Sequence, residues 1–281
     1  MDGIILIDKP LGYTSHDIVG KVRRVLHTKK VGHCGTLDPE ASGVLVVCVN
    51  KATKALQFLT SEDKHYVATI KLGISTDTYD MTGVIQNQVP YRYDLTLDKV
   101  EHVLAKFKGK QKQMPPMYSA IKVNGKKLYE YARAGETVEI QPRDIEIYSI
   151  ECAAFKEDEI HMKVHCSKGT YIRSLCVDIA EALGYPGCMS ALKRTQSGPF
   201  KLEDCVSLEA LENNQYEMIA LDDALAHLPS LTIEDEKIVY HGKTIDSALE
   251  GQIAIKNKDG HILAIYEQTG NHTLKNVRGL W

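Results

Sequence analysis

Eight consecutive residues hold the side chains with the clearest catalytic potential. In Gly32-His-Cys-Gly-Thr-Leu-Asp-Pro39, the carboxylate of Asp38 lies in a glycine-bounded turn, directly before a proline and before the apolar run 43–49. Pro39 disfavours the helical region for the residue before it, so Asp38 is predicted to lie in a stiff, non-helical segment at the edge of a sheet. A carboxylate held rigidly in this way can act as a nucleophile or stabilise positive charge.

Other reactive side chains give weaker patterns. His33 and Cys34 do not form a nucleophile pair, because neighbours in an extended chain point in opposite directions. His161 and His165 would share one face of a strand and suggest a metal site, but Lys163 lies between them on that face and would repel a cation. We therefore expect a surface-facing strand there and no metal.

Several common cofactor motifs are missing from the sequence. It contains neither a G-x-x-x-x-G-K-S/T phosphate loop nor a G-x-G-x-x-G fingerprint, so neither NTP hydrolysis nor dinucleotide chemistry is indicated. The run Asp77-Thr-Tyr-Asp80 lacks the acidic spacing and the final glutamate of a calcium loop.

Length and composition indicate a globular protein. With 281 residues, 43% of them hydrophobic, the chain can form one large domain and a small appendage. No run of eighteen apolar residues is present, so neither an export signal nor a membrane span is expected. The 7 cysteines form no Cys-x-x-Cys pair, which favours reduced thiols and a cytoplasmic location.

Charge is distributed unevenly along the chain. The whole has a net charge of −3, which argues against nucleic-acid binding, but residues 105–135 carry a local net charge of +7. This basic segment also contains Tyr118, Tyr129 and Tyr131, which could stack on bases. A solvated lysine-rich face explains the same charges equally well.

The expected elements mix helices and strands without a strict βαβ rhythm. Helices are predicted after a cap at Thr14 or Ser15, over 97–107 and over 171–183, from their apolar spacing. Strands are predicted over 43–49 (buried on both faces), 66–72, 145–150 and 159–166. This pattern favours an α+β fold with a mixed, largely antiparallel sheet and flanking helices.

Two segments differ from this main body. Met114-Pro-Pro-Met117 and Asn124-Gly125 interrupt regular structure and mark a long excursion. From about Leu231 the chain predicts a small β domain, with a hairpin around Asp259-Gly260 that must dock on the main domain for stability. The expected domains are therefore 1–230 and 231–281.

Arg173 is a candidate partner for Asp38. If it followed Tyr171 in an extended stretch, both side chains would project to one side of the backbone. An arginine beside Asp38 would keep that carboxylate ionised. Alternatively, Arg173 is an ordinary surface residue. Sequence spacing alone does not prove that Arg173 pairs with Asp38.

Six blocks of sequence, in order, resemble the bacterial tRNA pseudouridine synthase B family along nearly the whole chain. The blocks are Asp8-Lys-Pro-Leu-Gly-Tyr-Thr-Ser15, Gly32–Pro39, Lys64-His-Tyr66, Thr76-Asp-Thr-Tyr-Asp80, Pro115–Lys122 with Gly125–Ala132, and Lys168-Gly-Thr-Tyr-Ile-Arg173. The resemblance implies an isomerase that flips out a uridine of the tRNA T-loop, conventionally position 55. The enzyme then breaks the N1–ribose bond, turns the base and joins C5 to the ribose. It implies no cofactor and no metal.

The resemblance also implies roles for individual residues. Asp38 would be the nucleophile, Tyr66 would stack on the flipped base and help remove the C5 proton, and Arg173 would pair with Asp38. The remaining implied contacts with the substrate or the RNA come from Lys9, His33, Asp80, Tyr171 and Leu192 and from Lys122, Lys126 and Lys127. Whether Asp38 bonds to the sugar, deprotonates it or adds to the base stays open.

The resemblance further implies how RNA is held. An insertion over about 108–142 would grip phosphates, and residues 231–281 would form a short RNA-binding domain of the PUA kind. The expected partner is the T-arm of tRNA, bound by a monomer without a protein partner. The alternatives are a tRNA-binding or folding factor with secondary or absent catalysis, and an N-glycosidase that releases uracil.

Overall fold

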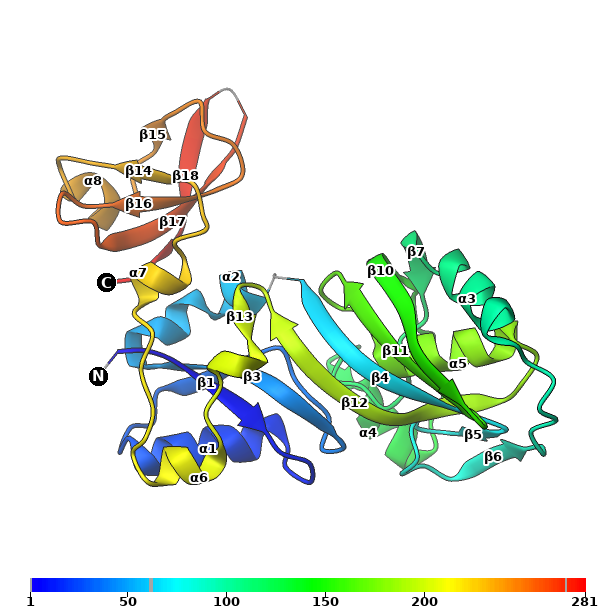
Figure 1. Cartoon of the computed structure of the whole chain (residues 1–281). Helices are drawn as coiled ribbons and strands as arrows, with labels where there is room; N and C mark the ends of the chain where they lie inside the picture. Colours follow the sequence, from blue (N-terminus) through cyan, green and yellow to red (C-terminus); the bar gives the residue numbers. More distant parts are fainter. Residues whose placement is uncertain (1, 61–62, 271) are drawn as a thin grey trace. The chain divides into compact units, whose positions relative to one another are not determined.

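The computed structural model describes residues 2–60, 63–270 and 272–281, which form two compact units (Figure 1). One unit comprises Met1–Pro39, Gly43–Ser61 and Pro199–Trp281, and is called the first unit below. The second unit comprises Glu40–Ser42 and Glu62–Gly198. Asp38 belongs to the first unit, and Tyr66 and Arg173 belong to the second.

The core of the first unit is built around β3 (Ala41–Val49). This strand pairs antiparallel with β1 (Gly3–Lys9) and with β2 (Val31–Cys34). Its side chains alternate between two hydrophobic clusters, one that contains Val44, Val46 and Cys48 and one that contains Leu45, Val47 and Val49. The prediction that this strand is buried on both faces is confirmed.

Helix α1 (Ser15–Val25) covers one of these clusters. It begins with a capping box, in which Thr14 Oγ1 accepts a hydrogen bond from the Asp17 N–H and Asp17 Oδ2 accepts one from the Thr14 N–H. The Thr14 hydroxyl also donates to Asp17 Oδ2 at 2.6 Å, and this bond, followed by the one from the Thr14 N–H, holds the pKa of Asp17 below its usual value. The cap predicted at Thr14 or Ser15 is therefore Thr14. After β3 the chain continues through η1 (Asn50–Ala55) and α2 (Leu56–Thr60).

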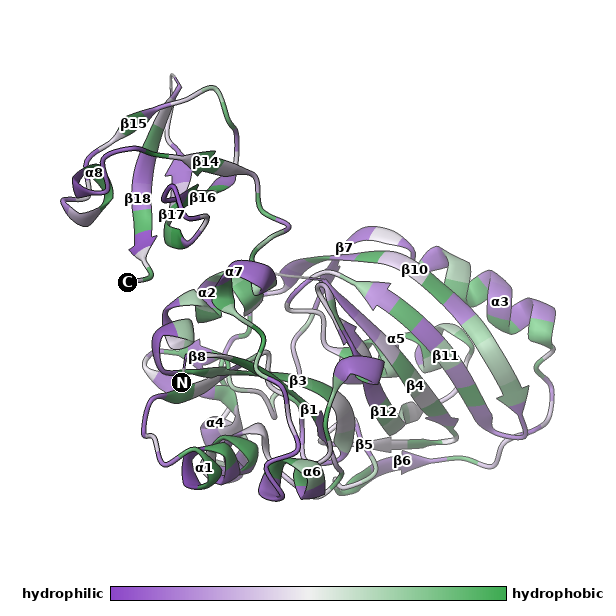
Figure 2. Cartoon of the chain, turned by 60° about the vertical axis from the view of Figure 1, so that its left-hand side comes forward, coloured by the Kyte–Doolittle hydropathy of each residue, from purple (hydrophilic) through white to green (hydrophobic). Residues whose placement is uncertain are grey.

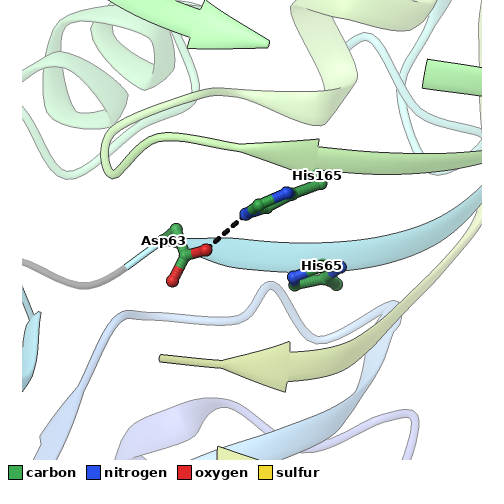
Figure 3. Close-up of side chains that lie close together, drawn as sticks. All are labelled: Asp63, His65 and His165. Atoms are coloured by element: carbon green, nitrogen blue, oxygen red, sulfur yellow. Dashed lines mark hydrogen bonds and ion pairs between the residues drawn. The ribbon is translucent and has the colours of Figure 1, made fainter. Parts of the chain in front are cut away.

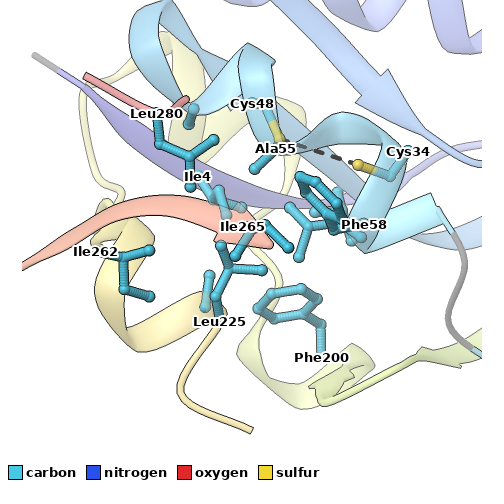
Figure 4. Packing of buried hydrophobic residues seen from close by; sticks show 14 of the residues in the cluster. Ile4, Cys34, Cys48, Ala55, Phe58, Phe200, Leu225, Ile262, Ile265 and Leu280 are labelled. Atoms are coloured by element: carbon cyan, nitrogen blue, oxygen red, sulfur yellow. Dashed lines mark hydrogen bonds between the residues drawn. The ribbon is translucent and has the colours of Figure 1, made fainter. Parts of the chain in front are cut away.

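The C-terminal part of the first unit ends in a small curled sheet with the strand order β14-β16-β17-β18-β15. Its members are β14 (Ser230–Thr232), β15 (Ile245–Asp246), β16 (Gln252–Lys256), β17 (Ile262–Gln268) and β18 (Thr273–Gly279), with α8 (Lys237–Tyr240) beside them. The predicted hairpin is present as β16 and β17, with Gly260 at a φ of 86°. Ile262, Ile265 and Leu280 pack in one cluster with Ile4 and Phe58 (Figure 4).

Short elements connect the start of this C-terminal segment to the small sheet. They are β13 (Phe200–Lys201), η2 (Leu202–Asp204), α6 (Leu208–Glu212) and α7 (Leu221–Ala224).

The second unit is built on an antiparallel sheet with the strand order β12-β4-β11-β10-β7. The strands are β4 (Lys64–Leu72), β7 (Gly109–Gln113), β10 (Arg143–Lys156), β11 (Glu159–Cys166) and β12 (Gly187–Ser197). Polar and apolar residues alternate along β4, β10 and β11, whereas β3 is hydrophobic over most of its length (Figure 2). Alternation is typical of a sheet with one face toward a core and one toward solvent.

Two helices pack in the second unit, α3 (Leu97–Lys106) and α5 (Ile172–Ala182). A hairpin of β5 (Ile74–Thr76) and β6 (Ile85–Gln88) precedes α3. Both helices were predicted from apolar spacing, and both are confirmed.

The excursion after β7 contains regular elements that the sequence did not predict. They are β8 (Lys122–Val123), β9 (Lys126–Lys127) and α4 (Leu128–Ala134). The turn between β8 and β9 is Asn124-Gly125, with φ values of 50° and 83°. Two successive left-handed residues are typical of a tight hairpin turn, so Asn124-Gly125 forms a hairpin rather than interrupting the structure.

The α+β fold class predicted from the sequence is confirmed, with antiparallel pairing prevalent in both units. Among the residues 2–60, 63–270 and 272–281, no helix has the length and apolar character needed to span a membrane.

Candidate active site

The backbone on both sides of Asp38 is held by the N-terminal segment of the first unit. On one side, the Ser15 hydroxyl accepts a hydrogen bond from the Leu37 N–H at 2.8 Å and donates one to the Leu37 carbonyl oxygen at 3.1 Å. On the other side, the Pro39 carbonyl oxygen accepts from the Gly12 N–H at 2.9 Å. Leu37 and Ser15 are 3% and 2% exposed, so this loop is anchored in the core.

Lys9 braces the same loop. Its side chain is 0% exposed, and its Nζ donates to the carbonyl oxygens of Tyr13 at 2.6 Å, Pro10 at 2.9 Å and Pro39 at 3.4 Å. A fully buried ammonium requires such partners, because its desolvation is otherwise costly. The RNA contact implied for Lys9 needs an exposed cation, and the described side chain has a structural role instead.

Asp38 itself lies outside any helix or strand, between β2 and β3. This agrees with the geometry predicted from the following proline. The fixed backbone at Leu37 and Pro39 limits the directions in which its carboxylate can point, which is the pre-organisation that a nucleophile requires.

His33 and Cys34 differ in environment, as their positions on a strand predict. Cys34 is 1% exposed, and its Sγ lies 3.9 Å from Cys48 Sγ in the core. Figure 4 shows the two side chains pointing toward each other. His33 is half-buried. Neighbouring residues of a strand face opposite sides, so the two side chains are not a nucleophile pair.

Arg173 is a buried residue of the second unit, 6% exposed. Its Nη1 donates to the Thr78 carbonyl oxygen at 2.9 Å, and its Nη2 donates to the Tyr118 carbonyl oxygen at 2.8 Å. Nη1 also lies 3.7 Å from Asp80 Oδ2. The planar guanidinium thus joins the turn that contains Asp80 to the segment that enters the insertion.

The helix predicted over 171–183 is present, so the extended stretch considered for Arg173 is not. Tyr171 caps helix α5 with an extended backbone, and Arg173 lies within the first turn of that helix rather than in an extended stretch. The apolar spacing of 171–183 had indicated this start, although Tyr171 makes no side-chain capping bond. Arg173 therefore reaches its partners from a helix terminus.

Asp80 is held by its own turn. Its Oδ1 accepts hydrogen bonds from Thr78 Oγ1 at 2.7 Å, Thr82 Oγ1 at 2.6 Å and the Thr82 N–H at 3.0 Å. Its other oxygen, Oδ2, is the one that lies near Arg173. Because Asp80 is 7% exposed, these bonds compensate for the loss of water around its charge.

Gln113 fixes the backbone of Tyr171. The Gln113 Oε1 accepts from the Tyr171 N–H at 2.8 Å, and its Nε2 donates to the Tyr171 carbonyl oxygen at 3.0 Å. Ser174, three residues after Tyr171, donates from its Oγ to the Met114 carbonyl oxygen at 2.8 Å. Sequence reasoning missed Gln113 and Ser15, since no local signal marks a side chain that binds a distant backbone.

Tyr66 and Leu192 lie on one face of the sheet in the second unit. Tyr66 is opposite Arg194, and the next position on that face, Ala68, is opposite Leu192. Tyr66 and Leu192 are each 9% exposed. Two residues that line one pocket are expected to lie on the same face of a sheet, as Tyr66 and Leu192 do.

The lysines of the insertion lie beside tyrosines. Lys126 Nζ is 4.9 Å from the centroid of the Tyr131 ring, and Lys127 Nζ is 5.3 Å from that of Tyr129. Lys126 also forms an ion pair with Glu136 at 3.0 Å. Lys122 on β8 is exposed. Tyr129 and Tyr131, two of the three tyrosines that could stack on bases, are therefore partly covered by cations of the same segment.

Comparison with known proteins gives matches over most of the chain. The family model described as TruB family pseudouridylate synthase (N terminal domain) matches residues 23–172, and the tRNA pseudouridylate synthase B C-terminal domain matches residues 173–230. The chain is 46% identical to tRNA pseudouridine synthase B of Bacillus subtilis (strain 168), over 95% of this chain and 93% of the relative. It is 43% identical to that of Bacillus cytotoxicus, over 95% and 92%.

Solved structures show the same likeness. A Cbf5–Nop10–Gar1 complex contains a chain that is 27% identical, with a TM-score of 0.76, over 99% of this chain and 85% of that one. An H/ACA ribonucleoprotein bound to a substrate RNA containing 2′-deoxyuridine contains one that is 26% identical, with a TM-score of 0.74 and the same coverage. The family models match residues 23–230 and the relatives cover 95% of the chain, so this chain belongs to the TruB family of pseudouridylate synthases.

Proposed function

We propose that this protein isomerises a uridine in the T-loop of tRNA, at the conventional position 55, to pseudouridine, with Asp38 as the nucleophile. The relatives named tRNA pseudouridine synthase B support tRNA as the substrate. The observation that carries the catalytic assignment is the loop of Asp38, whose backbone is hydrogen-bonded on one side by the buried Ser15 hydroxyl and on the other by the buried Lys9 ammonium and the Gly12 N–H. A pure binding protein has no need of a carboxylate held in this manner.

The reaction replaces the carbon–nitrogen bond between ribose and uracil by a carbon–carbon bond. The bond from ribose C1′ to uracil N1 breaks, the base turns, and C1′ joins C5; the C5 proton leaves and N1 takes up a proton. A ribose that loses its base develops positive charge, which the Asp38 carboxylate can capture or stabilise. No redox step is required in this balance.

The uridine must first leave its stack, which costs about a few kcal/mol. Tyr66 would stack on the flipped base and help to remove the C5 proton, with Tyr171 and Leu192 lining the pocket. Arg173 would keep Asp38 ionised, and Asp80 would support Arg173, in line with the 3.7 Å between them.

RNA binding would come from other surfaces. His33 would contact the T-loop, and Lys122, Lys126 and Lys127 of the insertion would neutralise phosphates without reading sequence. Residues 231–281, beyond the matched family models, would add contacts as a short PUA-like domain. We propose a monomer that acts in the cytoplasm on tRNA without a protein partner.

The test uses tRNA transcript labelled with tritium at C5 of its uridines. Wild-type protein should release tritium to water, up to one equivalent per T-loop. Asp38→Asn should release none while it binds the T-arm with wild-type affinity, because the amide is the same size but a poor nucleophile. Full turnover by Asp38→Asn would disprove the assignment of the nucleophile.

The same assay separates the alternative functions. A tRNA-binding or folding factor would bind the T-arm and leave its uridine unchanged, with no tritium released. An N-glycosidase would release free uracil, which chromatography detects. Neither alternative is favoured by an observation of its own.

A further inference from the structure

Three side chains gather on one face of the sheet in the second unit, away from the residues assigned above. They are Asp63, His65 and His165, whose candidate ligand atoms all lie within 4.8 Å of one another. Figure 3 shows Asp63 directly before β4, His65 on β4 and His165 on the adjacent β11.

Strand geometry explains why these residues meet. Asp63 and His65 are two positions apart, and residues at that spacing face the same side of an extended chain. His165 is the direct cross-strand partner of His65 in the antiparallel pairing of β4 with β11. Tyr66, the next residue, faces the opposite side, so the cluster lies on the other face from the residues proposed to hold the base.

The contacts within the cluster are close. The rings of His65 and His165 stack with centroids 3.9 Å apart and planes 11° from parallel. The Nε2 of His165 forms a hydrogen bond to Asp63 Oδ2, and Tyr148 packs against His165 with 4.7 Å between ring centroids. The Asp63 backbone is also held, since its carbonyl oxygen accepts from the Gly198 N–H at 3.0 Å.

We propose that Asp63, His65 and His165 form a binding site for a borderline divalent transition-metal ion such as Zn²⁺. Two imidazoles and one carboxylate are a ligand set that such ions prefer, whereas Mg²⁺ and Ca²⁺ prefer oxygen ligands alone. Three protein ligands leave one position of a tetrahedral ion for water.

The site can be reached and its ligands are suited to the ion. The side chains of Asp63 and His165 are 33% and 27% exposed, and both histidines line a hollow of about 190 Å³. Tetrahedral zinc ligands lie about 3.3 Å apart. The three groups must therefore approach one another, and rotation of a histidine ring out of the stack allows this.

The sequence had suggested that Lys163 would keep a cation away from this strand. Its Nζ instead lies 3.4 Å from Glu151 Oε1, so a carboxylate on β10 partly offsets its charge. His161, the other histidine considered there, is not part of the cluster, because its Nδ1 bonds to Thr69 Oγ1 at 2.9 Å. The neighbours of His165 in the cluster are His65 on β4 and Asp63 directly before it, and only the pairing register of β4 with β11 brings them together.

Metal titration of the full-length chain tests this site. The protein carries no histidine tag and is first dialysed against EDTA. We expect Zn²⁺ to bind with a stoichiometry of one by calorimetry, and Co²⁺ to give visible absorption bands that Zn²⁺ abolishes. Millimolar Mg²⁺ should not compete. Binding should also raise the Tm, since an ion that binds only the folded chain stabilises it.

Three variants, each with one ligand replaced, should lose this binding: His65→Gln, His165→Gln and Asp63→Asn. Loss of an outer partner of a metal site costs about tenfold to a hundredfold in affinity, so loss of a ligand should cost about a hundredfold or more. His161→Gln on the same strand is the matched control and should bind as wild type does. Circular dichroism checks that each variant is folded.

Two outcomes would overturn the proposal. One is the absence of heat and of visible bands with wild-type protein at millimolar metal. The other is binding that survives in all three ligand variants, which would place the ion elsewhere. Both readouts are independent of tRNA modification, so the proposal stands or fails separately from the proposed function.

Discussion

The hydroxyl of Ser15 bonds to both backbone polar groups of Leu37, the residue before Asp38, at 2.8 Å and 3.1 Å. The two residues are 22 positions apart, and both are buried. A single side chain at the start of α1 thereby sets the backbone direction at the candidate nucleophile. The element that carries Asp38 is short, but its orientation is determined by a helix that belongs to the core.

Ser15→Ala should therefore reduce both stability and turnover. The substitution leaves the buried Leu37 N–H without its acceptor, which costs about 1–3 kcal/mol of the free energy of unfolding. It also releases the backbone next to Asp38, so kcat should fall by about tenfold or more while KM for tRNA changes little. Urea denaturation and single-turnover kinetics measure the two effects.

The neighbouring Thr14 provides the control for this prediction. Thr14→Ala removes the helix cap and its bond from the Asp17 N–H, at a cost of about 1 kcal/mol in stability. It leaves the contacts with Leu37 in place, so kcat should stay at the wild-type value. Equal losses of kcat in both variants would show that Ser15 acts only through the stability of α1.

Asp80→Asn should destabilise the second unit more than Asp77→Asn does. Asp80 and Arg173 are both buried, and loss of one charge leaves the guanidinium without its described carboxylate neighbour, which costs about 3–5 kcal/mol. Asp77 uses its Oδ1 to accept from the Val84 N–H at 2.7 Å, a bond that an asparagine can keep. The loss there should be about 1 kcal/mol or less.

Urea denaturation of both variants measures this difference. If Asp80→Asn were no less stable than Asp77→Asn, the ion pair with Arg173 would contribute nothing to the fold. Tritium release by the same variants then tests the proposed support of Arg173, since Asp80→Asn should lose turnover and Asp77→Asn should retain it.

Much of the fold could be predicted because its causes are local. The unbroken apolar run of β3 indicates burial on two faces, and Thr14 with Asp17 gives the start of α1. Likewise, the Asp259-Gly260 pair predicts the hairpin of β16 and β17. In each case the residues that determine the structure are neighbours in the sequence or repeat with a fixed period.

The parts that could not be predicted depend on contacts between distant residues. Gln113 binds the backbone of Tyr171, 58 positions away. The sequence alone does not distinguish such a glutamine from an exposed one on an edge strand. His165 meets His65 only because β4 and β11 pair in one register, which a single sequence does not reveal. The non-helical geometry of Asp38 was predictable from Pro39, but the buried groups that fix it were not.

His261 and Asp222 should make the stability of the first unit depend on pH. The hydrogen bond from His261 Nδ1 to Asp222 Oδ2, 2.9 Å long, and then the charge of Asp222 raise the pKa of His261. A raised folded-state pKa gives stability that is fully present below the unfolded pKa of about 6.5 and lost as the pH rises through the folded pKa. His261→Gln should therefore lower the urea midpoint at pH 5 and leave it unchanged at pH 9.

Salt and a control variant test the cause of this pH dependence. The pair is exposed, so 1 M NaCl should reduce the effect of His261→Gln at pH 5. His102→Gln, a change on the exposed side of α3, should have the same small effect at both pH values. A midpoint shift for His261→Gln that is equal at pH 5 and pH 9 would assign the effect to packing rather than to protonation.

The lysines of the insertion should contribute unequally to tRNA binding under the proposed function. Each phosphate that a lysine neutralises adds about 0.7–0.9 to the slope of log K against log salt. Lys122→Gln should reduce the slope by about that amount, because its exposed ammonium is available to a phosphate. Lys126→Gln should reduce it less, since Lys126 must first release Glu136, 3.0 Å away, and leave the ring of Tyr131.

Filter binding of a T-arm stem-loop at salt concentrations between about 50 and 200 mM gives these slopes. Lys99→Gln on α3, outside the insertion, is the control and should leave the slope unchanged. A Glu136→Gln variant should bind more tightly than wild type, because it frees Lys126 for the RNA. Slopes that are the same for wild type, Lys122→Gln and Lys126→Gln would show that RNA does not contact the insertion through these lysines.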